Sequence, residues 1–410
     1  MTSVAKKVAF SNKIHPYFSG FSSDLMFWAA INTLFLTTVK HLTASNINLM
    51  ISIGMLVSIL SNFFVLKIIK KIGNIHSIRL GVFLLLIACL LITFSNSFFW
   101  ILIGEIIYEV SYLFKNMDNI ILRENLVYEK KEDQYIKYQN KGLMIYSFIT
   151  MIISFFSGII FNINAYLPMF IAITFCVLNI ILSYLLYEYK GNDCKKEEKV
   201  IPKKSDTKLP KIVCLLLLLF GIAYSLIELS QRNGKILIQY SLSDFLSDHK
   251  VAIYLSAIIT ISRVARVLSD YIFLKIYHKL NHKLLIVIES LLFFSIFSMI
   301  IGSFLPSLVV KVIVMAVGFS FLLVMRDSLE CYIKAEILNN CVGEKQQDAL
   351  SYMILARKIG NFAFSGVASL LLLRLNIVWV MTFLLVVAIF NIIVIKKVYH
   401  YLTGKEPNTN

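Results

Sequence analysis

Charged and polar side chains recur at helical spacing in three apolar segments of the chain. Spacings of three or four residues place such a set on one side of a helix, because each residue turns the helix by about 100°. A charged group at the centre of a bilayer costs roughly 2.5–3.5 kcal/mol, so each stripe should face a bundle interior or an aqueous cavity. The stripes are Glu105, Glu109, Tyr112 and Asn116; Tyr224, Glu228, Arg232 and Lys235; and Ser256, Thr260, Arg263, Arg266 and Asp270.

The first stripe contains two carboxylates, Glu105 and Glu109, near the middle of its segment. A carboxylate can gain and lose a proton in a protein, whereas a guanidinium stays charged. This pair is therefore expected to bind protons or cations in a cavity. The alternative is that both acids pair permanently with Arg or Lys on a neighbouring helix.

The second stripe offers a possible ion pair within one helix. Glu228 and Arg232 are four residues apart, a spacing at which opposite charges attract. They are interpreted either as a structural pair or as a solute-binding pair. Lys235 lies closer to the end of the segment, where its long side chain is expected to reach the membrane surface.

Arg263 in the third stripe has no acidic residue four positions away. Its partner should therefore come from another helix, with Glu105, Glu109 and Glu289 as the candidates, or be the solute or water. Arg266 and Asp270, four residues apart, are expected to pair along the helix or to form part of a gate.

Composition places the chain in the membrane. Hydrophobic residues make up 58% of the 410 residues and charged residues only 16%, and the mean hydropathy is +0.76. Soluble domains carry about 25% charged residues. The net charge of +16 does not indicate nucleic-acid binding, because the basic residues lie in short loops between apolar segments. Met1–Asp24 lacks the apolar run and cleavage site of a signal peptide.

Hydropathy divides the chain into twelve segments of about 20 residues, enough to cross about 30 Å of hydrocarbon. These predicted spans are 22–40, 46–66, 77–95, 98–117, 142–162, 167–187, 211–238, 250–273, 284–303, 306–325, 352–373 and 376–395. The corresponding domains are a tail (1–21), a six-helix half (22–188), a Lys-rich linker (189–210), a second six-helix half (211–396) and a tail (397–410).

Basic residues give the orientation. With the N-terminus in the cytoplasm, 31 of the 40 Lys and Arg residues fall on the cytoplasmic side and three fall outside. Such an excess over short loops fixes topology. Both termini and the linker are therefore predicted to be cytoplasmic, in the plasma membrane.

Two weak internal matches suggest a duplication. Leu66–Gly73 resembles Leu274–Asn281 at an offset of 208 residues, and each segment connects the second and third spans of its half. Asp118 and Asp327 each follow the fourth span of a half at nearly the same offset. The pattern favours two related six-helix halves.

With six spans on each side of a central loop, the chain resembles the major facilitator superfamily. That family's second-to-third loop commonly reads G-x-x-x-D-R-x-G-R-R. Aligned on Gly73, this chain has Lys71 for the first Arg, while Leu66 and Lys70 replace the first Gly and the Asp. The span-five exporter signature is absent, because no Pro follows Gly158. The departures weaken the gating role that the resemblance implies for this loop.

The resemblance implies a central cavity lined by spans one, four, seven and ten, which adds Asn32 and its neighbour Trp28 on span one. The predicted cavity residues that bind substrate or protons are Asn32, Glu105, Glu109, Tyr112, Glu228, Arg232 and Arg263. The predicted gating or cytoplasmic network residues are Lys70, Lys71, Gly73, Asp118, Arg266, Asp270, Arg326 and Asp327.

The sequence therefore predicts a secondary active transporter that moves a small solute by alternating access, with protons coupled through Glu105 or Glu109. It is expected to be monomeric, without a cofactor, a metal or enzymatic activity. A lipid-linked saccharide flippase is the alternative, and a lipid-modifying membrane enzyme is a further one. The residues do not identify the solute.

The topology is tested by single-cysteine labelling in intact cells. Cysteines placed at positions 195–208 should resist a membrane-impermeant maleimide until the cells are lysed, because the linker is predicted to be cytoplasmic. A cysteine at Lys250, in a predicted outer loop, is the positive control. Labelling of the linker before lysis contradicts the orientation.

Overall fold

The structure is a computed structural model that describes residues 3–26, 28–131, 134–189, 209–341 and 344–404. These residues form helices and contain no strand. The N-terminal half contains α1 (Ser3–Ser22), α2 (Trp28–Leu34), the π-helix η1 (Phe35–Val39), α3 (Ala44–Ile72), α4 (Asn74–Phe94), α5 (Phe98–Lys115), α6 (Asp118–Tyr128), α7 (Tyr135–Ile163) and α8 (Leu167–Leu185). The C-terminal half contains α9 (Lys211–Ser243), α10 (Asp248–Leu280), the short η3 (Asn281–Lys283), α11 (Leu284–Phe304), α12 (Leu308–Asn340), α13 (Glu344–Leu371) and α14 (Ile377–Leu402).

Nine helices among the described residues are long and apolar enough to cross a membrane, in α3, α4, α7–α12 and α14. The predicted spans that fall short are 22–40, 98–117 and 352–373. Span 22–40 is divided between two short helices. Span 98–117 corresponds to α5, which carries Glu105, Glu109 and Lys115. Span 352–373 corresponds to α13, which carries Arg357 and Lys358. Polar groups thus lower the hydropathy of the helices on which function is expected to depend.

The packing of one half repeats in the other. The helix pairs α4–α5, α3–α5, α1–α7 and α4–α8 have the counterparts α11–α12, α10–α12, α9–α13 and α11–α14. The matching segments Leu66–Gly73 and Leu274–Asn281 cover the ends of α3 and α10, although the side chains of 273–278 lie outside the described residues. The fold therefore consists of two pseudo-symmetric helical halves. The predicted boundary in 189–210 falls largely on residues outside the described ranges.

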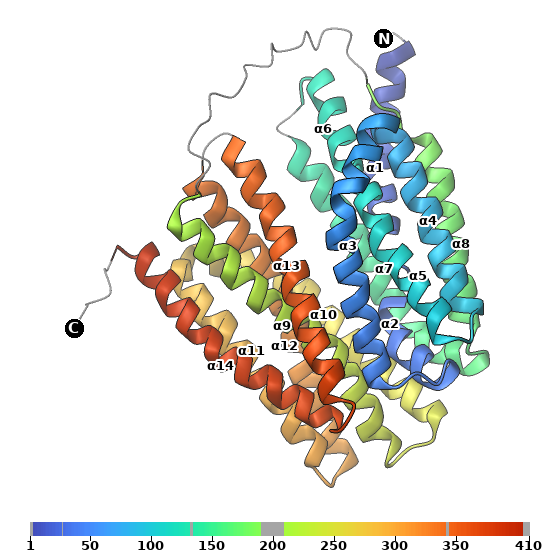
Figure 1. Cartoon of the computed structure of the whole chain (residues 1–410), viewed down its shortest axis with the longest axis vertical. Helices are drawn as coiled ribbons and strands as arrows, with labels where there is room; N and C mark the ends of the chain where they lie inside the picture. The colour runs from blue at the N-terminus through green and yellow to red at the C-terminus, as the bar shows by residue number, and fades with distance from the viewer. Residues whose placement is uncertain (1–2, 27, 132–133, 190–208, 342–343, 405–410) are drawn as a thin grey trace.

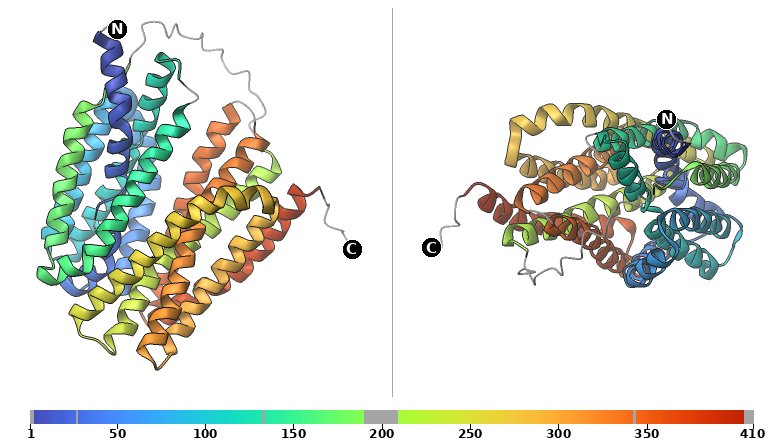
Figure 2. Two further views of the ribbon diagram at one scale, coloured as in Figure 1. Left: turned by 180° about the vertical axis from the view of Figure 1, so that it is seen from behind. Right: turned by 90° about the horizontal axis from the view of Figure 1, so that it is seen from above.

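The most extensive contacts between the halves are two helix pairs, α3 with α13 and α7 with α10, and α2 also contacts α9 and α10. These pairs are also related by the repeat, since α3 corresponds to α10 and α7 to α13. The ribbons of the halves meet at the end that carries η1 and the α13–α14 turn (Figure 1). They diverge toward the end that carries α6 and the N-terminus, as Figure 2 shows from behind.

The prediction of an N-terminal tail over residues 1–21 is wrong for its described part. Residues 3–22 form α1, which packs against α7 and α8. Val8 and Phe18 are fully buried, as are the polar side chains of Ser11, Asn12 and His15. These polar residues lower the hydropathy of the segment. Their side chains nevertheless lie inside the bundle, where other helices provide some of their hydrogen-bond partners.

The first helix is interrupted at residues 23–26, between α1 and α2. A helix end inside a bundle leaves carbonyl groups that need donors. The ammonium of Lys115 on α5 donates to the carbonyl of Ser22 at 3.1 Å, and the Asn179 amide on α8 donates to the carbonyl of Phe21 at 3.1 Å. Side chains remote in sequence therefore stabilise the interruption.

Glycines allow a close approach of α9 and α13. A Cβ added at Gly360 would collide with the carbonyl oxygen of Gly221 and the hydroxyl of Ser225, both on α9. At Gly221 an added Cβ would stand 3.0 Å from the carbonyl oxygen of Ala356. Backbone atoms cannot move aside as a flexible side chain can, so Gly221 and Gly360 need to be glycine for this close approach.

Gly360→Ala should destabilise the protein by about 1–3 kcal/mol, because the extra methyl forces α9 and α13 apart. The measurement is thermal unfolding of the purified protein in detergent. Gly366→Ala is the control on the same helix, since its Cβ would meet only the Ser52 hydroxyl, at 3.2 Å. Equal melting temperatures for the two variants would contradict the close-contact interpretation.

Candidate functional site between the two halves

The carboxylates of α5 lie side by side over a glycine of α3. A Cβ at Gly54 would stand 3.3 Å from Cγ of Glu105 and 3.4 Å from Cγ of Glu109. Glu105 is only 5% exposed, and its Oε2 has no hydrogen-bond partner among the described residues. Glu109 is partly exposed and lies in the electrostatic field of Lys358, Arg357 and Arg232, all from the C-terminal half.

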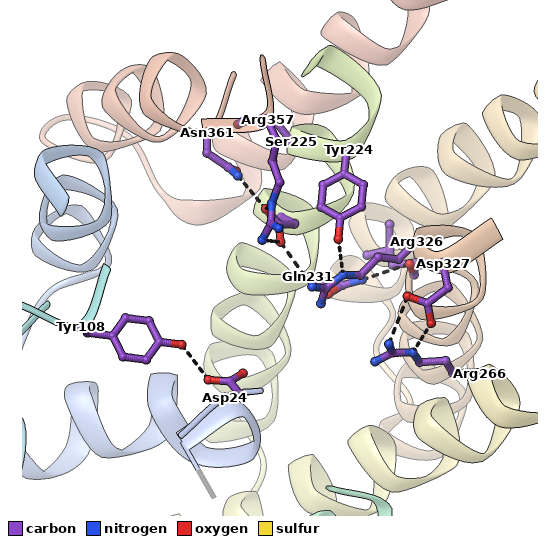
Figure 3. A network of polar contacts seen from close by, with 12 residues as sticks. Asp24, Tyr108, Tyr224, Ser225, Gln231, Arg266, Arg326, Asp327, Arg357 and Asn361 are labelled. Carbon is purple, nitrogen blue, oxygen red and sulfur yellow. Dashed lines mark hydrogen bonds and ion pairs between the residues drawn. The ribbon is translucent and has the colours of Figure 1, made fainter. Parts of the chain in front are cut away.

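A third acid, Asp24, lies in the interruption of the first helix. Its Oδ1 accepts a hydrogen bond from the Tyr108 hydroxyl at 2.6 Å and from the backbone N–H of Leu25 at 2.7 Å. The Tyr108 ring packs edge-on against Tyr112, with 5.1 Å between centroids. The interruption thus brings a carboxylate next to the aromatic face of α5 (Figure 3).

The C-terminal half surrounds Glu228 of α9 with cations. Arg357 of α13 donates from Nε to Oε2 at 2.9 Å and from Nη2 to Oε1 at 2.5 Å. Asn361 donates to Oε2 at 2.6 Å, and Nη2 of Arg326 on α12 is 3.5 Å from Oε1. Arg326 also donates from Nε to the Tyr224 hydroxyl at 2.9 Å. Figure 3 shows this cluster on the opposite side from the Asp24–Tyr108 pair.

A separate ion pair joins α10 and α12. Arg266 donates from Nε and Nη2 to the two carboxylate oxygens of Asp327, at 2.6 and 3.0 Å. This two-point contact fixes both side chains, because the guanidinium and the carboxylate are planar and match in spacing.

Side-chain hydrogen bonds link the two halves. Lys235 of α9 donates to Oδ1 of Asn32 at 2.7 Å, and Gln239 donates to the Thr37 hydroxyl at 2.7 Å. Further contacts between the halves are Asn48 to Asn233 in both directions (2.8 and 3.3 Å), Ser45 to Ser369 (3.1 Å) and Lys358 to Ser58 (2.7 Å). The α3 residues in these contacts lie between its first turn and its middle, so the contacts gather toward the end where the ribbons meet.

Comparison with known proteins identifies the fold. No protein-family model and no curated protein sequence matches the chain significantly. Among solved structures, the nucleoside transporter NupG matches with a TM-score of 0.70 at 10% identity, over 97% of this chain and 99% of that one. A bacterial homologue of the human lysosomal transporter Spinster, inward-facing and unoccupied, matches with a TM-score of 0.66 at 11% identity over 100% of both chains. The chain has the fold of the major facilitator superfamily.

The facilitator fold brings several of the predicted cavity residues to the facing sides of the halves. Glu105, Glu109 and Tyr112 lie on α5, and Glu228 and Arg232 lie on α9. The predicted pair Glu228–Arg232 is wrong, because Glu228 binds Arg357 and Asn361 instead. Nη1 of Arg232 is buried without a hydrogen-bond partner among the described residues.

Three other sequence predictions are corrected. Arg263 is 8% exposed and lies in the electrostatic field of Tyr146 of α7; among the described residues it forms no ion pair with Glu105, Glu109 or Glu289, and Asn391 donates to Glu289 at 3.0 Å. Lys235 is buried against Asn32 and does not reach the surface. Arg266 pairs with Asp327 on another helix, while the side chain of Asp270 lies outside the described residues.

The predicted gating residues separate into three groups. Lys70 and Lys71 are exposed at the end of α3, and Gly73, with φ of 83°, makes the one-residue turn to α4. Asp118 is buried in the N-terminal half, where the ring of His15 is 3.6 Å from its carboxylate. Arg326 and Asp327 do not follow the tenth span, because α12 continues to Asn340 and they lie near its middle.

The sequence interpretation missed Arg357, Lys358 and Tyr108, and mentioned Asp24 without assigning it a role. Arg357 and Lys358 fall in the first turns of the predicted span 352–373, but α13 begins at Glu344 and places them near the middle of the helix. Tyr108 is four residues before Tyr112, so the same spacing that predicted the stripe could have included it.

The Arg266–Asp327 pair should stabilise the fold measurably. Asp327→Asn should cost about 1–3 kcal/mol, because it leaves a partly buried guanidinium without its charged partner. Adding Arg266→Gln should restore part of that loss in thermal unfolding. Lys334→Gln, which removes the exposed Lys334–Glu330 pair of the same helix, is the control and should be near neutral. Additive losses in the double variant would show that the pair is not coupled.

Proposed function

We propose that this protein is a secondary active transporter that moves a small solute through alternating access of the two halves. The observation that carries the proposal is the distribution of charge. The facing acids of the N-terminal half are Asp24, Glu105 and Glu109, and the facing groups of the C-terminal half are mostly cations: Arg232, Lys235, Arg263, Arg326, Arg357 and Lys358.

The free-energy cost of placing such charged groups in a membrane is too high for a packing role alone. Charged groups within a membrane mark ion and solute pathways. The contacts that close one end include hydrogen bonds between Asn, Ser, Thr, Gln and Lys side chains. A neutral bond of this kind contributes only about 0.5–1.5 kcal/mol and one from a lysine roughly 1.5–3 kcal/mol, so a rocking movement of the halves can exchange them for water. The fold favours this function over the flippase and the membrane enzyme.

Proton coupling is assigned to Glu105 or Glu109. The cations that act on them come from the other half: Arg232 on Glu105, and Lys358, Arg357 and Arg232 on Glu109. If the halves move apart around these acids, the field that favours their charged form weakens. Protonation then differs between the inward- and outward-open states, which couples a proton gradient to solute movement.

The test uses purified protein in proteoliposomes with an imposed proton gradient. A solute found in a growth or toxicity screen of cells overproducing the protein is supplied outside. At least one of Glu105→Gln and Glu109→Gln should lose gradient-driven accumulation while retaining solute exchange, since Gln keeps the shape but cannot titrate.

The control is Glu124→Gln, which removes an exposed carboxylate of α6 and should accumulate solute like the natural protein. If both α5 variants still accumulate solute with unchanged pH dependence, the carboxylates are structural. If the natural protein moves no compound in the screen, the transporter proposal itself fails.

A further inference from the structure

Two guanidinium groups share a single carboxylate in the C-terminal half. Arg357 donates twice to Glu228, and Arg326 lies 3.5 Å from the same carboxylate while it donates to the neutral Tyr224 hydroxyl. Both guanidinium carbons also stand over the Tyr224 ring, 4.8 Å from its centroid for Arg357 and 5.6 Å for Arg326. The cluster therefore has an excess of positive charge.

The two arginines keep unused donors that are accessible. A guanidinium carries five N–H donors, and each arginine uses only part of its set on Glu228 and Tyr224. The Arg326 side chain is 30% exposed and the Arg357 side chain 36%, although both lie well inside their helices. Glu228 and Tyr224 occupy part of each donor set, and the exposed fractions show that the rest of both side chains stays accessible; Figure 3 shows Tyr224, Arg326 and Arg357 together.

The neighbouring acids are held by other cations: Glu330 of α12 lies in the field of both arginines but binds Lys334 at 2.6 Å. Asp327 is bound at both oxygens by Arg266, and Lys358 adds a further cation that donates to the Ser58 hydroxyl. Glu109 is the acid that faces Arg357 and Lys358 from the other half. Farther along the same interface, Nε of the deeply buried Arg263 has no hydrogen-bond partner among the described residues.

We propose that Arg326 and Arg357 bind an oxyanion group, a carboxylate or a phosphate, of the transported solute. This inference deepens the proposed function and depends on it. A structural pair would need one arginine for one carboxylate, and a second guanidinium beside the first adds repulsion. An oxyanion relieves that repulsion and matches the planar donor geometry of arginine.

The test measures the melting temperature of the purified protein in lipid nanodiscs at constant ionic strength. The anionic probes are succinate, citrate and glycerol 3-phosphate, the neutral probes are uridine and maltose, and the cationic probe is tetraphenylphosphonium. A ligand that binds the folded state raises the melting temperature in proportion to its occupancy, so titration gives an apparent affinity. At least one anion should stabilise the protein, and carboxylate and phosphate probes separate the two sources of the oxyanion.

Arg326→Gln and Arg357→Gln should each weaken the apparent affinity for that anion at least tenfold. Glu228→Gln should not weaken it, because it removes the competing negative charge. Lys397→Gln is the matched control: it removes an exposed cation of α14 outside the cluster. The unliganded melting temperature of each variant reports folding. If Arg357→Gln does not fold, Glu228→Gln/Arg357→Gln removes both partners together and should show the same loss.

Stabilisation by neutral or cationic probes alone, or by no anion at all, overturns the inference. So does an anion effect that survives both arginine substitutions, or one that is lost in Glu228→Gln. Accumulation of a neutral solute in proteoliposomes, together with no anion effect, would leave the proposed function standing and reject only the oxyanion site.

Discussion

The free-energy cost of a charge inside an apolar bundle decides where most of the functional side chains can lie. Each must find a counter-charge, a backbone carbonyl or water. Glu228 meets the requirement with Arg357 and Asn361, Asp327 meets it with Arg266, and Lys115 meets it with the carbonyl of Ser22. Because each partner comes from another helix, the same contacts that solvate the charges also join α9 to α13, α10 to α12 and α5 to α1.

The interruption of the first helix follows from the same requirement. Unwinding at residues 23–26 exposes carbonyl groups, and the donors that satisfy them come from α5 and α8. In return the unwound backbone brings Asp24 to the Tyr108 hydroxyl, beside the α5 acids. An uninterrupted helix would leave Lys115 without the carbonyl of Ser22 as an acceptor. The interruption and the buried lysine therefore depend on each other.

Local patterns of the sequence predict the facilitator architecture and the charged stripes well, because hydropathy and helical spacing are properties of neighbouring residues. They fail where the structure depends on distant ones. No Gly or Pro lies in 23–26, so nothing local indicates the interruption, and Lys115 and Asn179 that stabilise it are far along the chain. Arg357 and Lys358 lower the hydropathy of their own helix, so the predicted span begins at residue 352 although α13 begins at Glu344. The partners of Glu228 and Arg263 could not be chosen from spacing, since several acids and bases were available on other helices.

The strengths of the contacts within and between the halves differ in a way that suits a rocking mechanism. Within the C-terminal half, the charged contacts include two two-point arginine–carboxylate pairs, Arg357–Glu228 and Arg266–Asp327. Across the interface, the described polar contacts are hydrogen bonds of amides, hydroxyls, backbone groups, two lysines and one histidine. Charge-assisted bidentate contacts are roughly twice as strong as neutral hydrogen bonds, so each half holds its shape while the interface exchanges partners.

Opposite charges on the facing surfaces add an attraction without fixed geometry. A solute or a proton that neutralises part of either surface changes that attraction directly, and the equilibrium between the two orientations of the halves responds to it.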